Sequence, residues 1–298
     1  MKKATLWLAW IFIFIGLFLS ILVICSIYQD GKFQYGTLDW KYAQNLNNVA
    51  SILGFLFTGA GTFAIFITLS KQQEQFDQAQ KQIVTQQFET TFFNMLNQLF
   101  GIKNSIQGSV DGKSFSGQEF LHEALMELKE KYQQHLISKV DINDVLHIIS
   151  INEMPIHSKL QMVKDDLNDV YVSSYDVYYS QLGHYFRYFY NLVKFTIENR
   201  EGKPFSDSKK YVRLIQAQLS NDELGLIFCN SLSDKSLNSE KESRIFKWLE
   251  EHSLLENIDS RSLLHRSLHA MYPATDFKFL NRDERKKWKG YVMNKLNE

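Results

Sequence analysis

The sequence predicts an all-α protein with an N-terminal two-helix transmembrane hairpin, a helical stalk and a C-terminal all-α cytoplasmic domain. Two observations lead to this fold class: two long stretches without charge lie in the first 70 residues, and helix-start signals recur in the rest of the chain. With 3 Pro and 14 Gly among 298 residues, the chain lacks the turn residues of an all-β protein. Its 2 Cys exclude a disulfide scaffold.

The overall charge balance argues against a general nucleic-acid binder. The chain has 33 basic and 33 acidic side chains, so its formal net charge is zero. A mean hydropathy of −0.25 is typical of an ordinary soluble protein. That average conceals an uneven distribution of apolar residues, because they are concentrated near the N-terminus.

The first uncharged stretch runs from Ala4 to Gln29 and is almost wholly apolar in its centre. At a rise of about 1.5 Å per residue, a helix of this length reaches roughly 39 Å, which is enough to cross a bilayer with some tilt. The apolar run is too long for a cleaved signal peptide, and no Ala-x-Ala site follows it. We therefore expect a retained membrane span over about residues 5–28.

The second uncharged stretch, residues 42–70, predicts a second span over about residues 46–69. It contains small residues that allow close packing of helices in lipid, among them Gly54, Gly59 and Gly61. Two buried helices of a soluble core are the alternative, but neither stretch shows a polar face. The first 70 residues are therefore expected to form a membrane hairpin with a short external loop at 30–41.

The charges that flank the two spans predict their orientation. Lys2 and Lys3 precede the first span and Lys71 and Lys81 follow the second, whereas the loop between the spans carries two lysines. Because basic residues favour the cytoplasmic side, both termini are expected in the cytoplasm. The C-terminal domain, residues 71–298, would then be cytoplasmic.

A stalk helix over residues 71–99 is expected to continue the second span. This segment lacks Pro and Gly, and its apolar residues recur three or four positions apart. A coiled-coil stalk would imply a homo-oligomer, but the apolar repeat breaks at Gln86 and Gln87. Self-association of the chain therefore stays open at this point.

Helix-start signals predict the rest of the domain. Gly108, Gly112 and Gly117 indicate a loop after the stalk. Three segments then have the spacing of a capping box, in which a Ser oxygen and a Glu carboxylate bind free backbone N–H groups. These segments are Ser116–Glu119, Ser220–Glu223 and Ser239–Glu242. Residues 142–151 have the composition of a strand but stand too isolated to support a sheet.

Two further helical segments carry distinct faces. Between Leu182 and Ile197 an apolar stripe is expected opposite a polar face that holds His184 and Arg187. Residues 211–232 predict one helix that ends near Leu219 and a second that starts at the Ser220 cap.

No constellation of catalytic residues is found, so we expect no enzyme, no cofactor and no metal site. Phosphate-cradling glycine motifs are missing from the sequence. His265 and His269 lie four apart, but Arg266 stands where a zinc protease has its Glu, so an exposed helix face is favoured. Glu127 and Lys129 form only a loose nuclease-like pair, and Cys229 lies in an apolar run where it should be inert.

Two charged runs also favour exposed faces. The acidic run comprises Asp165, Asp166, Asp169 and Asp176. The C-terminal basic segment, residues 282–289, contains Trp288 and is open to two alternatives: contact with anionic lipid or nucleic acid, or a solvated helix, which is favoured.

Four ordered blocks of sequence resemble the phage abortive infection proteins of the lactococcal AbiC type. The blocks are Phe88–Asn97, Leu182–Arg187, Ala217–Leu224 and Leu254–Asn257, and the resemblance spans roughly residues 70–258. It implies a bacterial antiphage defence protein that arrests or kills the infected cell. No catalytic residue is implied by the family.

The same layout is similar to the two-transmembrane effectors encoded beside some retron reverse transcriptases. That resemblance implies a reverse transcriptase bound to its DNA–RNA product as a partner. A stand-alone protein is equally compatible with the sequence.

The blocks also have a physical interpretation. His184 and Arg187 lie three apart on one helix and are candidates to bind an anion or a partner carboxylate, with Gln216 and Gln218 lining a polar groove beside them. A structural hydrogen bond or an exposed face is the alternative for each. The remaining block residues are expected to be structural, with the three Phe in the core: Phe88, Phe92, Phe93, Ser220, Glu223, Leu254, Leu255 and Asn257.

The function expected from these observations is a non-enzymatic effector of the bacterial inner membrane. Its cytoplasmic domain senses infection or is released by a partner, and its spans then permeabilise the lipid bilayer. Two alternatives stay open: a membrane-tethered toxin of the nuclease type, and a sensor or scaffold that recruits a separate killer.

Overall fold

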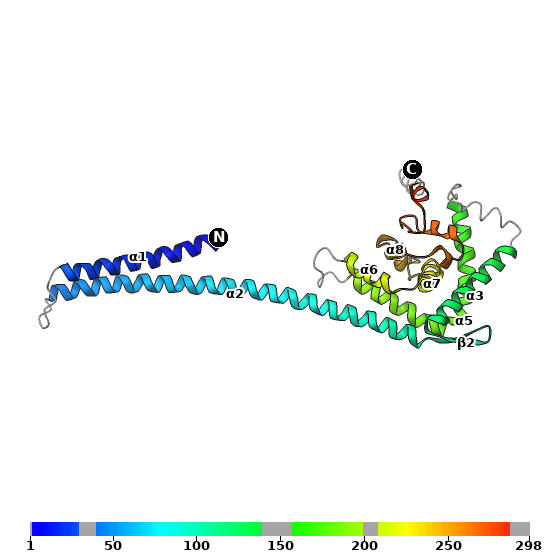
Figure 1. Ribbon diagram of the computed structural model, residues 1–298, viewed down its shortest axis with the longest axis horizontal. Helices are drawn as coiled ribbons and strands as arrows, with labels where there is room; N and C mark the ends of the chain where they lie inside the picture. The colour runs from blue at the N-terminus through cyan, green and yellow to red at the C-terminus, as the bar shows by residue number, and fades with distance from the viewer. Residues whose placement is uncertain (1, 30–39, 139–156, 199–207, 287–298) are drawn as a thin grey trace. The chain divides into compact units, whose positions relative to one another are not determined.

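The computed structural model describes residues 2–29, 40–138, 157–198 and 208–286. The chain divides into two compact units, Met1–Ile83 and Val84–Glu298. Both are mainly helical (Figure 1), so the all-α prediction holds for most of the described chain.

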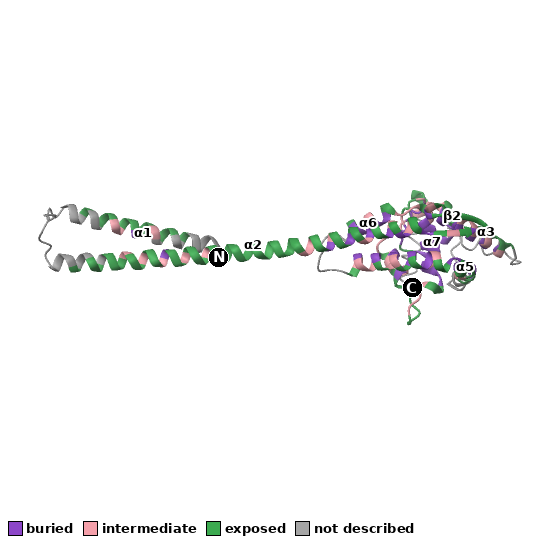
Figure 2. Cartoon of the chain, turned by 90° about the horizontal axis from the view of Figure 1, so that it is seen from below, coloured by how far each residue is buried: buried purple, intermediate pink, exposed green. Residues whose placement is uncertain are grey.

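The first unit contains α1 (Lys2–Gln29) and the N-terminal part of α2 (Trp40–Ser105). The two helices lie side by side (Figures 1 and 2). At their contact, a Cβ on Gly16 would lie 3.6 Å from the Phe57 ring. By contrast, a Cβ added at Gly54, Gly59 or Gly61 would meet nothing within 4 Å, so no close helix neighbour is seen for these three glycines among the described residues.

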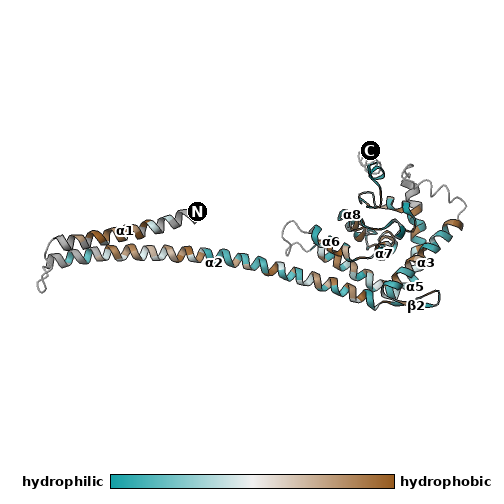
Figure 3. Ribbon diagram, viewed as in Figure 1, coloured by the Kyte–Doolittle hydropathy of each residue, from teal (hydrophilic) through white to brown (hydrophobic). Residues whose placement is uncertain are grey.

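Apolar side chains of the first unit face outward. Large exposed side chains follow one another along α2, including Phe55, Ile65 and Phe66 (Figures 2 and 3). The hydroxyls of Thr58, Thr62 and Thr68 donate to carbonyls four residues earlier, at 2.8–2.9 Å, which satisfies them without water.

Among the described residues, one helix, α2 from Ala50 onward, is long and apolar enough to cross a membrane by length and composition; the apolar part of α1 found by the same criterion is shorter, Ile13–Leu22. By this measure, one of the two expected spans is supported among the described residues. The loop between the helices, residues 30–39, lies outside the described residues.

The second unit begins with the C-terminal part of α2, which runs unbroken through Gln86 and Gln87 to Ser105. A two-stranded antiparallel sheet follows, made of β1 (Gln107–Val110) and β2 (Lys113–Ser116). The expected glycine loop is therefore a β-hairpin. Gly112, at φ +76°, lies in its two-residue turn, where a left-handed backbone favours glycine.

Helices α3 (Gly117–Ser138), α5 (His157–Glu198), α6 (Ser208–Gln218), α7 (Asn221–Leu232) and α8 (Arg244–Glu251) follow the hairpin. Three short 3₁₀ helices complete the unit: η1 (Asp234–Ser236), η2 (Ser260–Ser262) and η3 (Arg266–Met271). Helix α5 kinks at Tyr178, whose backbone is not helical (φ −105°, ψ 16°). The possible strand at 142–151 lies outside the described residues.

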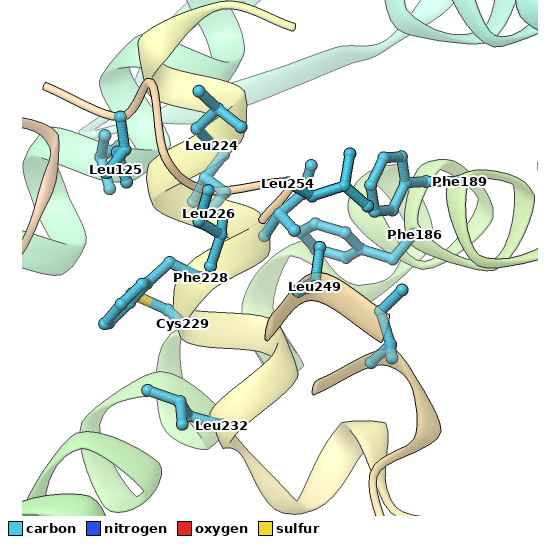
Figure 4. Close-up of a cluster of buried hydrophobic side chains, with 14 of the residues drawn as sticks. Leu125, Phe186, Phe189, Leu224, Leu226, Phe228, Cys229, Leu232, Leu249 and Leu254 are labelled. Atoms are coloured by element: carbon cyan, nitrogen blue, oxygen red, sulfur yellow. The ribbon is translucent and has the colours of Figure 1, made fainter. Parts of the chain in front are cut away.

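Helix α7 is the centre of the core. Its side chains are buried from Glu223 to Cys229, which requires neighbours on all sides. Leu125 of α3, Phe186 and Phe189 of α5, and Leu249 and Leu254 surround it (Figure 4). Gly225 allows the closest approach, because a Cβ there would lie 2.5 Å from the Ser262 carbonyl oxygen.

The capping predictions have different outcomes. Ser220 and Glu223 form a complete capping box, so the prediction that one helix ends near Leu219 and another starts at Ser220 is confirmed. Helix α3 begins directly after Ser116. The Ser239–Glu242 prediction is wrong: Asn238 Oδ1 accepts from the N–H groups of Glu240 and Glu242, which makes a turn, and α8 starts later at the N-cap Ser243.

Three phenylalanines of the first sequence block were expected in the core, and this expectation is correct for two of them. Phe88 and Phe92 are buried, whereas Phe93 is 45% exposed because it projects from the opposite side of α2.

Candidate functional site

A cavity of about 540 Å³ opens in the second unit between α5, α7 and the segment that leads into α8. Helix α5 lines it along Gly183–Asn191, and α7 contributes Ile227 and Asn230. The opposite wall is formed by residues 235–240 together with Arg244 and Ile245 at the start of α8. The cavity is therefore bounded by helices whose positions are fixed by the core around α7.

Three cations line this cavity: Arg187, Lys235 and Arg244. Arg187 is exposed, and its Nε donates to the Gly183 carbonyl oxygen at 3.1 Å, which leaves both terminal nitrogens of the guanidinium for other partners. Lys235 Nζ lies 2.7 Å from Asp176 Oδ1 and 5.5 Å from the centre of the Tyr175 ring. The charge of Lys235 is thus shared with a carboxylate.

Aromatic rings form the inner wall of the cavity. Tyr175 and Phe186 are buried, with ring centres 6.3 Å apart, and Tyr190 is half-buried against Trp248. Burial raises the pKa of Tyr175, an effect that nearby Arg187 partly opposes. The tyrosine is therefore neutral at physiological pH.

The four candidate ligand residues do not meet at one place. Arg187 lines the cavity, whereas His184 is exposed on α5 and does not line it. Gln216 is buried, and its Nε2 donates to the carbonyls of Ser253 and Leu254 at 3.4 and 3.2 Å. Gln218 is exposed at the end of α6. Arg187 therefore has different neighbours from the two glutamines.

A buried ionic cluster lies at the N-terminus of α7. Glu223 is 1% exposed, and its carboxylate accepts from Tyr185 Oη at 2.6 Å and from the Ser220 N–H at 2.8 Å. Lys103 Nζ, near the end of α2, lies 3.3 Å from Glu223 Oε2. Burial and the adjacent carboxylate raise the pKa of Tyr185, which keeps that phenol a hydrogen-bond donor.

The fourth sequence block, Leu254–Asn257, contributes mainly to packing. Leu254 and Leu255 are fully buried, and Gln216 holds the backbone at Leu254. Asn257 is exposed, and its Oδ1 accepts from Lys278 Nζ.

The surroundings of the other residues considered for catalysis or metal binding indicate structural roles. Burial raises the pKa of the Cys229 thiol to about 12, so an inert thiol is expected. His265 and His269 do not share an α-helical face, because the chain there forms the 3₁₀ helix η3. His269 is 1% exposed, which contradicts the expected solvated face. Burial lowers its pKa, and its Nδ1 lies 2.9 Å from the Arg266 carbonyl oxygen.

The loose nuclease-like pair is also engaged in packing. Glu127 accepts from the Tyr178 hydroxyl and lies 2.5 Å from Lys131 Nζ, while Lys129 Nζ donates to the Arg261 carbonyl oxygen. In the part of the chain that the structure describes, no group of three or more His, Cys, Asp or Glu side chains is arranged to hold a metal ion.

The acidic run differs in part from expectation. Asp166 is buried and lies 3.3 Å from His135 Nε2, whereas the other three acidic residues of the run are exposed. Of the basic C-terminal segment, residues 282–286 are described. There Arg285 Nε donates to the Leu280 carbonyl oxygen.

Sequence reasoning did not find Lys235, Arg244 or Asn191 as cavity residues. Asn191 lies on the same polar helix face as Arg187, and the two cations lie in or after a segment without periodicity. The run of Ser, Asn and Lys between α7 and α8 is the one available signal, and its composition indicates only a surface loop.

Residues 177–263 match the family model described as "Putative phage abortive infection protein". No curated protein and no solved structure matches the chain. The matched segment is less than a third of the chain and contains most of the cavity wall, all of α7 and three of the four sequence blocks. This match supports a relation of residues 177–263 to phage abortive infection proteins.

Proposed function

We propose that this protein is an antiphage defence effector of the bacterial inner membrane, and that it arrests the infected cell by permeabilising that membrane. One observation carries the proposal: the abortive infection segment 177–263 shares its chain with a helix long and apolar enough to cross a bilayer. The family match supports a function in defence, and the apolar helix supports the membrane as the target.

The membrane-embedded part would comprise both helices of the first unit. The outward-facing side chains of α2, such as Phe55 (78% exposed) and Ile65 (64% exposed), suit a lipid environment better than water. The flanking lysines favour a two-span topology with both termini in the cytoplasm.

Permeabilisation requires more than two helices, so the spans would assemble from several copies of the chain. Gly54, Gly59 and Gly61 support this step, because a Cβ at each would meet nothing within 4 Å in the part of the chain that the structure describes, and small residues allow another helix to approach closely. The cytoplasmic domain would restrain assembly until it senses an infection cue or is released by a partner. For a retron-linked protein that partner would be the reverse transcriptase with its DNA–RNA product.

A charge placed in the apolar part of α2 tests the proposal. Ile65→Lys puts an ammonium group at a site that would contact lipid, at a cost of about 2.5–3.5 kcal/mol near the centre of a span. Gln75→Lys, at an exposed position farther along the same helix, is the matched control. Phage plating efficiency and survival of infected cells are compared for the wild-type chain and both variants.

The wild-type chain and Gln75→Lys should reduce phage plating and commit infected cells to arrest, whereas Ile65→Lys should not protect. Membrane fractionation and immunoblotting establish that the variants are present at equal levels. Full protection by an Ile65→Lys chain that no longer fractionates with membranes would contradict the proposal and favour a soluble activity.

A further inference from the structure

We propose that the cavity between α5, α7 and α8 is a binding site for a mononucleotide, with Arg187 and Arg244 on the phosphate and the aromatic wall against the base. The inference rests on the charge, the ring content and the size of the cavity, and it does not depend on how the protein acts on membranes.

The charge of the cavity favours an anion. Arg187, Lys235 and Arg244 face a single acidic lining residue, Glu240. Among the described residues, neither Arg187 nor Arg244 has a carboxylate within ion-pair distance, unlike Lys235, which is held by Asp176. A guanidinium donates two parallel hydrogen bonds to phosphate, so two arginines without an ion-pair partner at one cavity are suited to a phosphate group.

The uncharged part of the lining favours a ligand with a planar ring. Tyr175, Phe186 and Tyr190 line the inner side of the cavity; the first two are buried and Tyr190 packs against Trp248, so they form an apolar wall that a planar base can contact. Asn191 is exposed at the same wall, and its amide offers both a donor and an acceptor for the edge of a base. A purely inorganic anion would make no contact with this aromatic wall.

The size of the cavity suits one nucleotide unit. A volume of about 540 Å³ lies within the range of small-molecule sites, roughly 300–1,000 Å³. The sequence lacks a glycine-rich phosphate loop, so the site is proposed to bind the nucleotide without hydrolysing it.

Equilibrium dialysis of the purified full-length chain in phosphatidylcholine nanodiscs tests the assignment. The probes are the radiolabelled 5′-monophosphates of adenosine, guanosine, cytidine and uridine, with the corresponding nucleosides and inorganic phosphate as competitors. The variants are Arg187→Gln, Arg244→Gln and the conservative Arg187→Lys. Arg213→Gln, exposed on α6 outside the cavity, is the matched control, and thermal unfolding verifies that each variant is folded.

At least one of the four monophosphates should bind saturably, and its nucleoside and inorganic phosphate should each compete at least about tenfold more weakly. Arg187→Gln and Arg244→Gln should each weaken binding about tenfold or more, Arg187→Lys should weaken it less, and Arg213→Gln should bind as the wild type. The proposal is overturned if no monophosphate binds below about 1 mM, or if both Gln variants bind like the wild type. Because binding is measured without phage, failure here is distinguishable from failure of the proposed defence function.

Discussion

The carboxylate of Glu223 joins three helices of the second unit at one buried point. It caps its own helix α7 through the Ser220 N–H, accepts the phenol of Tyr185 from α5, and pairs with Lys103 of α2. A charge that is 1% exposed is stable only because each of its oxygens has a partner. Removal of this side chain would leave Lys103 and Tyr185 without their acceptor.

Glu223→Ala is therefore expected to destabilise the second unit by about 3–5 kcal/mol, the usual cost of removing one member of a buried ion pair. Glu223→Gln keeps the cap and the acceptor for Tyr185, so it should cost only about 1–2 kcal/mol. Thermal unfolding of the purified chain, followed by circular dichroism, measures the difference at about 2–4 °C per kcal/mol. Glu251→Ala, at an exposed position, is the control, and equal melting of the Ala and Gln variants would contradict this role.

The thiol of Cys229 gives a prediction that depends on pH. Burial raises its pKa from 9.0 to about 12, so the native state holds the proton more tightly than the unfolded state. The stability that this thiol contributes is complete below pH 9 and is lost as the pH rises from about 9 to about 12.

In a Cys25→Ser background, the native protein should therefore react slowly with iodoacetamide at pH 8.5, because the thiolate is the reactive form and Cys229 is fully buried. Addition of denaturant should raise the rate at which Cys229 reacts with iodoacetamide to that of an ordinary cysteine. Modification of the folded protein at the same rate as the unfolded protein would show that this part of the core is open.

Among the elements, α2 shows how one helix changes its environment along its length. Its positions 69–83 are exposed, whereas from Phe88 to Ile102 one face is buried in the second unit. Phe88 and Phe92 each lie 5.0 Å, between ring centres, from Tyr211 of α6, whose hydroxyl donates to Glu89 of α2 at 2.7 Å. These contacts fix the end of α2 against α6.

Substitution of two adjacent phenylalanines tests this packing. Phe92→Ala should destabilise the second unit by about 3–5 kcal/mol, because the ring is fully buried and its removal leaves a cavity. Phe93→Ala should cost about 1 kcal/mol or less, since 45% of that side chain is already exposed. Chemical denaturation of both variants provides the measurement, and similar losses would contradict the assigned face of α2.

The elements that the sequence predicted well are those specified by local contacts. The Ser220 cap and the apolar stripe from Leu182 to Ile197 depend on residues within one or two helical turns. The cap is confirmed, and the stripe is buried from Leu182 to Val193 and half-buried at Ile197. The Ser239 cap failed because Asn238 competes for the same backbone N–H groups. The β-hairpin was missed because its strands are only four residues long and their composition is that of a loop.

The candidate cavity was less accessible to sequence reasoning than the helices. Arg187 was found because it lies on a periodic helix, but Arg244 belongs to a different helix, and tertiary packing brings both to one cavity. The same reason explains why Gln216 was assigned to a groove. Its actual partners, the carbonyls of Ser253 and Leu254, lie in a segment that no pattern connects to α6.

The chain combines two units of different polarity. Zero net charge and a mean hydropathy of −0.25 average an outward-facing apolar unit with a polar, helical unit that carries the abortive infection segment. A protein with this division is expected to act where the first unit resides. We therefore predict that the membrane, and not nucleic acid, is damaged first when phage infection activates the protein.

Membrane potential and nucleic-acid integrity, followed together in infected cells that carry the wild-type chain or Ile65→Lys, test this claim most directly. A potential-sensitive dye reports depolarisation, and gel analysis of total DNA and RNA reports cleavage. Depolarisation and dye entry are expected before phage lysis in wild-type cells, with intact host RNA, and no depolarisation is expected in the variant. Growth arrest with polarised membranes and fragmented nucleic acid would contradict it and favour a membrane-tethered nuclease.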